Sequence, residues 1–291
     1  NATINSIEHG GPMKIPLETF KKQCEGAERE TGLKIPFDVE GADYMLMMSS
    51  SEIMQFHEFI GACAQIFDKA GVSWTYSSEA FEATNAAMQM GSSDMAGQLV
   101  QRIVDAAEKL KVKYVISPEC GHAYTAIRWE GPNLIGRPYN FKVVHILEFL
   151  DQLREEGKIK LKDKEMAEIT FHDPCQLVRR GGVLEQPVNL VEMVTENYVP
   201  MPEQGQWNWC CGGGGGVSAN EDAYPLQTKA FKMKKQQLEA TGVKHLITSC
   251  SNCRNIIEEA LEEYDMDIEV YGLTEMIAEH LETDNKPQES E

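Results

Sequence analysis

The stretch KHLITSCSNCRNIIEEALEEYDMDIEVYG, residues 244–272, contains a short apolar run, an amphipathic segment and a second apolar run. The first run, "KHLITSC", is typical of a buried strand, and "CRNIIEEALEEY" repeats its apolar residues at helical spacing. "IEVYG" then indicates another strand. Because a strand–helix–strand unit brings the second strand back in the same direction, this stretch predicts two parallel strands joined by a helix.

The same alternation extends outward on both sides. Further strands are expected at "ADYMLMM", "VKYVISP" and "EITFHDP", each followed by segments with helical periodicity, and "LTEMIAEHL" is expected to form a last helix. Strands that alternate with helices are typical of an α/β fold with a mainly parallel sheet. We therefore expect an α/β fold built of Rossmann-like lobes.

The two halves of the chain resemble each other. "VISPECGHA" (115–123) aligns with "LITSCSNC" (246–253), and "WTYSSEAF" (74–81) aligns with "WNWCCGGG" (207–214). Such self-similarity indicates two pseudo-repeated modules, of which the second keeps the cysteines and the first has lost nearly all of them. The expected units are an N-terminal extension at 1–41, a degenerate module at 42–160, a metal-binding module at 161–282 and a disordered tail at 283–291.

Composition limits the classes of function. The 291 residues carry a formal net charge of −19, and an acidic surface argues against nucleic acid, which is bound through Lys and Arg. We find no apolar run of about 18 residues that would span a membrane and no charged-then-apolar leader at the start of the sequence. We therefore expect an intracellular protein with no direct membrane span and no nucleic-acid partner.

Five of the eight cysteines follow the pattern C-x34-CC-x38-C-x2-C. Clustered cysteines in a long chain without an export signal indicate metal or redox chemistry rather than a disulfide framework. Zinc is one interpretation, but five cysteines exceed the four ligands of a tetrahedral site, and an adjacent pair suits a larger cluster better. A disulfide between neighbouring cysteines is strained and is the weakest alternative. The spacing thus favours an iron–sulfur cluster over zinc.

The cysteines also fall where α/β folds place their sites. Cys175 follows an expected strand, Cys250 ends another, and Cys253 opens the helix after it. Sites in open α/β sheets gather beyond the carboxyl ends of the strands. Gly212 and Gly213 follow the cysteine pair and allow the backbone to approach a bulky group closely.

The motif "HDPC…CCGGGG…SCSNC" resembles the CCG module of the heterodisulfide reductase (B/D-like) family. The likeness covers roughly residues 42–282, including the tandem arrangement of two modules. It implies a non-cubane 4Fe-4S cluster and an active site that reduces or forms a disulfide. The ligands that it implies are Cys175, Cys210, Cys211, Cys250 and Cys253.

"FHDPCQLVRRGG" and the degenerate first module resemble, more closely, the DsrK family of the DsrMKJOP complexes. This likeness implies reduction of a DsrC-like protein disulfide or trisulfide in dissimilatory sulfur metabolism. It also implies electrons from the membrane quinone pool, delivered through a quinone-interacting cytochrome subunit and other subunits on the cytoplasmic face of the inner membrane. That family has a ferredoxin-like region with two cubane clusters. Since no such cysteine run is present, we expect either only the CCG part or a shortened relative here.

Several neighbouring side chains are candidates for supporting roles. His172 and Asp173 are expected either to relay a proton or to form a hydrogen-bonded pair at the end of a strand. Arg179 and Arg180 are expected to neutralise cluster charge or to hold a substrate carboxylate, with a solvated helix surface as the alternative for one of the two. Trp207 and Trp209 are expected to shield the cluster as part of the core. Cys24 and Cys63 are expected to be structural thiols. Cys120 and His122 are expected either to face the site across the lobe interface or to be a relic of the lost module.

Two other functions stay open at this point. CCG modules also resemble electron-transfer subunits of flavoprotein dehydrogenases of the glycolate oxidase type. A zinc-stabilised interaction domain without catalytic activity is the other alternative. Ser77 and Ser78 stand where the second module has its cysteine pair, so the first module is expected to hold no cluster.

Overall fold

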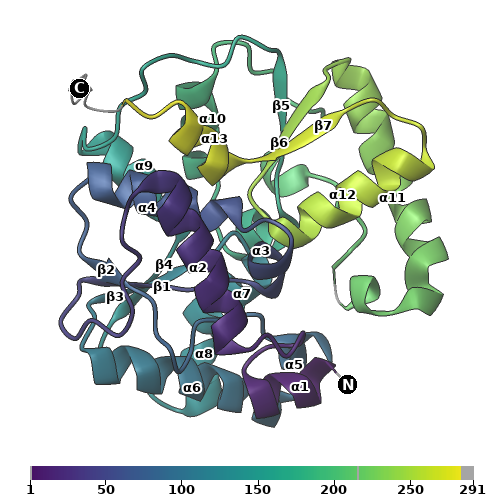
Figure 1. Ribbon diagram of the computed structural model, residues 1–291. Helices are drawn as coiled ribbons and strands as arrows, with labels where there is room; N and C mark the ends of the chain where they lie inside the picture. The colour runs from purple at the N-terminus through teal and green to yellow at the C-terminus, as the bar shows by residue number, and fades with distance from the viewer. Residues whose placement is uncertain (1, 215, 283–291) are drawn as a thin grey trace.

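A computed structural model describes residues 2–214 and 216–282 and contains two parallel sheets (Figure 1). The first sheet has the strand order β2-β1-β3-β4 and the second has the order β5-β6-β7. The expected α/β fold with parallel sheets is therefore confirmed. The tail expected to be disordered, 283–291, lies outside the described residues.

The first sheet and its helices come from the N-terminal half of the chain. Its strands are β1 (Tyr44–Leu46), β2 (Trp74–Thr75), β3 (Tyr114–Ser117) and β4 (Lys142–His145). Its helices are α1 (Ala2–His9), α2 (Leu17–Thr31), α3 (Ser50–Met54), α4 (Glu58–Lys69), α5 (Ala86–Gln89), α6 (Ser93–Leu110), α7 (Gly121–Thr125), α8 (Gly131–Ile135) and α9 (Ile146–Glu155), with a π-helical turn, η1 (Ala126–Glu130).

The second sheet comes from the C-terminal half. Its strands are β5 (Ile169–His172), β6 (His245–Thr248) and β7 (Glu269–Gly272). Its helices are α10 (Glu185–Val194), α11 (Tyr224–Thr241), α12 (Ser251–Glu263) and α13 (Leu273–Glu279), with a π-helical turn, η2 (Gln176–Arg180), and three 3-10 turns, η3 (Gly205–Trp207), η4 (Val217–Ala219) and η5 (Glu221–Ala223).

The two sheets have corresponding strands. β1, β3 and β4 follow one another across the first sheet as β5, β6 and β7 do across the second. The counterpart of β2 is a single parallel bridge between Ile169 and Tyr198. Trp74 lies in β2, so its counterpart in the second sheet is Tyr198. Trp207 lies further along the chain, and the alignment of Trp74 with Trp207 is therefore wrong.

The lobes share a hydrophobic core. One buried cluster contains residues of the first sheet together with Ile169, Ile247 and Leu273 of the second lobe. A second cluster lies under α11 and α12 and includes three of the cysteines. The thiols therefore lie beside a core of their own, next to the lobe boundary. The division of the chain near residue 160 stays a prediction.

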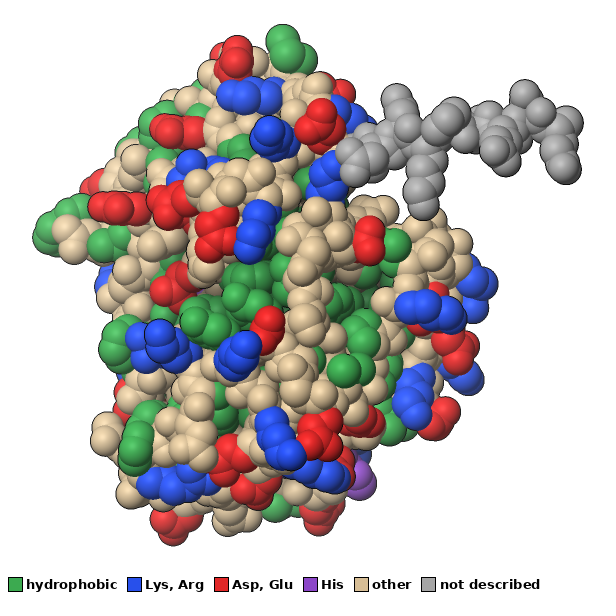
Figure 2. Space-filling view, turned by 90° about the vertical axis from the view of Figure 1, so that its left-hand side faces the viewer, with side chains coloured by type: hydrophobic (Ala, Val, Ile, Leu, Met, Phe, Trp, Pro, Cys, Tyr) green, Lys and Arg blue, Asp and Glu red, His purple; other side chains and the backbone are tan. Residues whose placement is uncertain are grey.

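The surface in Figure 2 carries basic and acidic side chains mixed around a band of hydrophobic ones, without a continuous basic field on that face. Among the described residues, we find no helix with the length and apolar character needed to cross a membrane.

Candidate metal centre

Two of the cysteine segments meet because β5 and β6 are parallel neighbours. β5 pairs with β6 from Ile169 opposite His245 to His172 opposite Thr248, so both strands end at the same edge of the sheet. Cys175 follows β5 and begins η2, and Cys250 follows β6 as the N-cap of α12. This is the edge at which α/β sheets bind their ligands.

The loop with Cys210 and Cys211 is attached to the segment that follows β5. The side chain of Asn208 donates a hydrogen bond to the carbonyl of Asp173. Arg179 donates to the Gln206 carbonyl over 3.0 Å and to Asn208 Oδ1 over 2.9 Å. These bonds fix the loop, and with it the cysteine pair, over the carboxyl end of β5.

The glycines after the pair are required by space. Gly212 has φ +101°, and a Cβ there would lie 2.8 Å from the Gln227 carbonyl oxygen. A Cβ at Gly213 would lie 2.3 Å from Cγ1 of Ile256. Since real side chains do not tolerate such contacts, the sequence needs glycine for this loop to pack on α11 and α12.

All five cysteines line one small cavity. The sulfurs of Cys211 and Cys253 are 3.3 Å apart. Cys211, Cys250 and Cys253 are buried, whereas Cys175 and Cys210 are half-buried. The cavity therefore has a closed side and an open side. Its other lining residues are His122, Pro174, Gln176, Gly214 and Asn252.

Hydrogen bonds between the thiols favour thiolates at two positions. The thiol of Cys175 and then that of Cys211 donate to Cys210 and hold its pKa far below the ordinary value, while the pKa of Cys175 is raised in turn. The Cys253 thiol donates to Cys250 and, with backbone N–H groups, lowers the Cys250 pKa to about 7. Thiolates are the form of cysteine that binds metals.

His172 and Asp173 are not among the described residues that line the cavity. A nitrogen of His172 nevertheless lies within 4.8 Å of the sulfurs of Cys211 and Cys253. His172 is fully buried, and its ring nitrogens have no hydrogen-bond partner among the described residues. Burial, and then the charge of Lys234, lower the His172 pKa well below its usual range. The Asp173 carboxylate accepts a hydrogen bond from the Gly205 N–H over 2.8 Å. Burial raises the Asp173 pKa.

The two arginines have different surroundings. Arg179 is tied to the cysteine loop by its hydrogen bonds to Gln206 and Asn208. Arg180 is exposed and lies 3.3 Å from Glu130 of the first lobe. The interpretation as a solvated helix surface therefore fits Arg180, and Arg179 positions the loop.

The tryptophans do not shield the thiols. Trp207 is 73% exposed and Trp209 is 42% exposed, so the expectation that they belong to the core is wrong. The loop that carries them lies at the rim, where side chains next to a buried cysteine pair can point to solvent. Cys24 and Cys63 are buried in the core of the first lobe, in agreement with a structural role.

The first lobe contributes to the site in a way that the sequence left open. His122, in α7, lines the cavity beside Cys175 and Cys210. The backbone N–H of Gly121 donates a hydrogen bond to the Cys250 sulfur. Cys120 is buried and is not among the residues that line the cavity. Ser77 and Ser78 line a separate hollow with Asp38 and Glu40.

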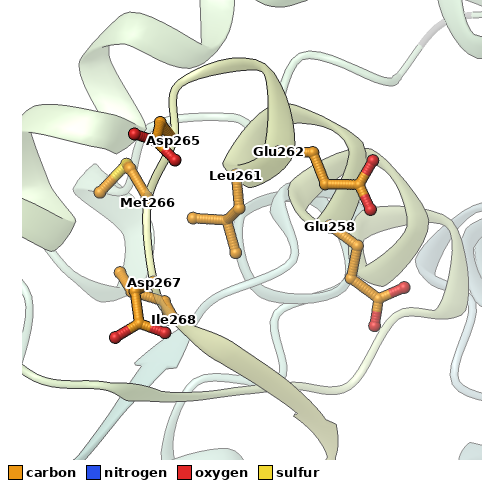
Figure 3. A pocket seen from close by; sticks show the side chains of 7 residues that line it. All are labelled: Glu258, Leu261, Glu262, Asp265, Met266, Asp267 and Ile268. Atoms are coloured by element: carbon orange, nitrogen blue, oxygen red, sulfur yellow. The ribbon is translucent and has the colours of Figure 1, made fainter.

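Sequence reasoning missed Lys234, a buried lysine on α11. A signal for it was present, since it lies between Phe231 and Leu238 at helical spacing, on the buried face of α11. An open acidic hollow of about 730 Å³ at the far end of α12, lined by residues from Glu258 to Ile268, contains no cysteine (Figure 3). We assign it no role.

The donor set fits an iron–sulfur cluster. A nitrogen of His172 and the sulfurs of Cys211 and Cys253 lie within 4.8 Å of one another, which is also compatible with a single ion. Such an ion would leave Cys175, Cys210 and Cys250 without a role on the same cavity. Thiolates are the usual ligands of iron–sulfur clusters, and a group with several irons can use all five.

Comparisons with known proteins agree with this donor set. Residues 169–258 match the family described as CCG, cysteine-rich domain. The chain is 28% identical to the D subunit of dihydromethanophenazine:CoB–CoM heterodisulfide reductase of Methanosarcina mazei, over 77% of this chain and 56% of that protein. It is 28% identical to EtfAB:quinone oxidoreductase of Syntrophomonas wolfei, over 76% of this chain and 32% of that protein.

A third relative is the Hdr-like menaquinol oxidoreductase iron-sulfur subunit 2 of Archaeoglobus fulgidus, 29% identical over 75% of this chain and 46% of that protein. The chain thus spans about half or less of the length of these curated relatives. Among solved structures, a hypothetical protein from Helicobacter pylori has a similar fold, with a TM-score of 0.58 at 11% identity, over 91% of this chain and 55% of that one.

Proposed function

We propose that this chain, a heterodisulfide reductase-like protein with a CCG domain at residues 169–258, holds an iron–sulfur cluster and uses it to reduce or form a disulfide. The observation that carries the proposal is the convergence of five thiols on one cavity. The proposed ligands of the cluster are Cys175, Cys210, Cys211, Cys250 and Cys253.

The cavity suggests how a substrate would approach. Cys175 and Cys210 are the half-buried thiols, and His122 lies beside them. The closed side, with Cys211 and Cys253, is covered by α11 and α12. A disulfide would therefore reach the site from the side of Cys175, Cys210 and the first lobe.

Reduction of one disulfide consumes two electrons and two protons and gives two thiols. The cluster, when bound, supplies the electrons. Among the described lining residues, His122 alone has an ionisable side chain other than a thiol, and burial lowers its pKa so that a neutral imidazole is present near neutral pH. We propose that His122 exchanges protons with the substrate sulfurs, with His172 and Asp173 as an inner relay and Arg179 as the residue that positions the loop.

The finer assignment rests on the sequence resemblance. We propose a non-cubane 4Fe-4S cluster, a DsrC-like disulfide or trisulfide substrate in dissimilatory sulfur metabolism, and electrons from the quinone pool through other subunits at the cytoplasmic face of the membrane. The names of two relatives, a menaquinol oxidoreductase subunit and a quinone oxidoreductase, support the quinone part.

Anaerobic purification with metal and sulfide analysis tests the proposal. We expect several irons and matching sulfide per chain, and an EPR signal on oxidation or reduction. Cys24→Ala should leave the iron content unchanged because Cys24 lies in the core of the first lobe. One zinc and no iron per chain would instead assign the thiols to a structural ion, which gives no EPR signal.

A second candidate function is electron transfer to or from a flavoprotein. The likeness to EtfAB:quinone oxidoreductase favours it, because that relative is named for a flavoprotein electron donor. The two candidates differ in their reaction with substrate. Thiol release from a DsrC-like trisulfide by the reduced protein supports the first, whereas rapid oxidation by a flavoprotein without thiol release supports the second.

A further inference from the structure

Lys234 lies on the buried face of α11. The buried residues of this helix recur at spacings of three and four, and Lys234 lies between Phe231 and Leu238 among them. It is 1% exposed. Lysine is almost never fully buried unless its charge is compensated, because an ammonium group loses its hydration there.

The direct contacts of Lys234 do not supply that compensation. Its Nζ donates a hydrogen bond to Gln237 Oε1 over 2.6 Å and lies 3.6 Å from the sulfur of Met201. Both partners are neutral. A neutral amide oxygen satisfies one of the three N–H donors and leaves the charge itself without a balancing anion.

The acidic side chains that act on the charge of Lys234 belong to the proposed metal centre and its support. They are the carboxyl of Asp173, followed by the thiols of Cys211, Cys253 and Cys210. Cys211 and Cys253 also share the hydrophobic cluster under α11 with Phe231 and Leu238, next to Lys234 in the helix. Lys234 is absent from the described lining of the cavity, so it approaches these thiols from the side of α11.

We propose that Lys234 is the buried counter-charge of the metal centre and raises its reduction potential. The inference rests on the proposed function, since it requires a thiolate-bound cluster at Cys211, Cys253 and Cys210. A cluster that gains one electron gains one negative charge, and a fixed cation nearby stabilises that state more than the oxidised one. Lys234 would thus be a positioning residue that acts through its charge and touches no substrate.

A role as counter-charge explains why a lysine is present at a buried position where its charge lowers the stability of the fold. Replacing a buried charge with an apolar side chain of similar length is often neutral or stabilising. A lysine retained for structure would stabilise the apoprotein, whereas a counter-charge would stabilise only the metal-bound form. The two explanations therefore predict opposite changes in the stability of the apoprotein.

The test compares Lys234→Met with Lys235→Met in the full chain, purified anaerobically. Lys235 is the next residue of the helix and pairs with Glu239 at the surface. In a redox titration followed by EPR, we expect the ratio of reduced to oxidised cluster at a fixed potential to be at least tenfold lower in Lys234→Met than in wild type. For a one-electron couple, this ratio corresponds to a reduction potential lower by about 59 mV. Lys235→Met should match the wild type, and apo Lys234→Met should unfold at the same temperature as wild type or higher.

Unchanged potential in an iron-loaded Lys234→Met protein would overturn the proposal, and so would a lower unfolding temperature of its apoprotein. Lys234→Gln, which retains a hydrogen-bonding group, provides a second variant. If both variants lose iron while their apoproteins stay folded, the charge is required for cluster binding, in agreement with a counter-charge. A wild-type protein that contains no iron would defeat the proposed function itself, and that result is visible before any variant is made.

Discussion

The beginnings of α7 and α12 are the same structure in the two lobes, yet only one carries the metal-binding pattern. Cys120 is the N-cap of α7 with φ −145° and ψ 102°, and Cys250 is the N-cap of α12 with φ −150° and ψ 109°. Each follows a central parallel strand, β3 or β6. The difference lies three residues later, where the first lobe has Ala123 and the second has Cys253.

The two helix starts also face each other. The N–H of Gly121 donates a hydrogen bond to the Cys250 sulfur, and the N–H of Ser251 donates to the Glu119 carbonyl over 2.9 Å. The first lobe, which lacks the cysteine pattern, therefore contributes a backbone N–H donor and the His122 side chain to the cavity of the second lobe. The first lobe, which has Ala123 at the position that corresponds to Cys253, thus forms one wall of the cavity.

The largest expected effect separates the two cysteines of this comparison. Cys250→Ala removes a proposed ligand, and we expect loss of most of the iron. Cys120→Ala removes a buried thiol outside the cavity lining, and we expect iron content equal to that of wild type. Iron and sulfide analysis of both variants provides the measurement. Equal iron loss in the two variants would mean that both lobes hold the metal.

The sequence predicts the parallel α/β fold and the convergence of the cysteines, because strand–helix alternation and the position after a strand are local signals. It does not predict the exposure of Trp207 or the burial of Lys234. Exposure of a loop side chain depends on where the loop docks, and the docking depends on Asn208 and Arg179 contacting a segment about 30 residues away. His122 was left open because its place depends on how the lobes pack.

The next prediction concerns the first lobe alone and tests whether its stability depends on pH without involving the cysteines. Glu82 is buried there, and burial raises its pKa from 4.5 to about 7. Because the folded pKa is above the unfolded one, its contribution to stability is fully present below pH 4.5 and is lost as the pH rises through 7. The shift corresponds to roughly 3 kcal/mol of unfolding free energy. Glu82→Gln should remove that part of the pH dependence.

Urea unfolding of wild type and Glu82→Gln at pH 5 and pH 8.5 gives the measurement. We expect the variant to gain stability relative to wild type at the higher pH only. A constant difference at both pH values would show that Glu82 does not titrate in this range. Glu40, which is exposed and paired with Lys111, offers a control as Glu40→Gln.

A smaller effect is expected at the loop that carries the cysteine pair of the second lobe. Arg179→Ala removes the hydrogen bonds to Gln206 and Asn208, and we expect a loss of about 2 kcal/mol in unfolding free energy together with lower iron content. Arg180→Ala removes an exposed pair with Glu130 and an exposed hydrogen bond to Gln176, and it should change stability by less than about 0.5 kcal/mol. Similar results for both arginines would contradict the positioning role of Arg179.

The smallest effect concerns one of the hydrogen bonds between the two lobes. The hydroxyls of Ser251 and Ser49 are 2.8 Å apart and buried, at the start of α12 and α3. Ser251→Ala breaks this link, and since the Ser49 hydroxyl still accepts a hydrogen bond from the Glu52 N–H, we expect a loss of about 1 kcal/mol without loss of iron. Ser218→Ala, at an exposed serine of the same lobe, provides the control for urea unfolding. If Ser251→Ala also released the iron, the lobe interface would hold the metal centre together as well as the fold, and the first lobe would be more than a wall of the site.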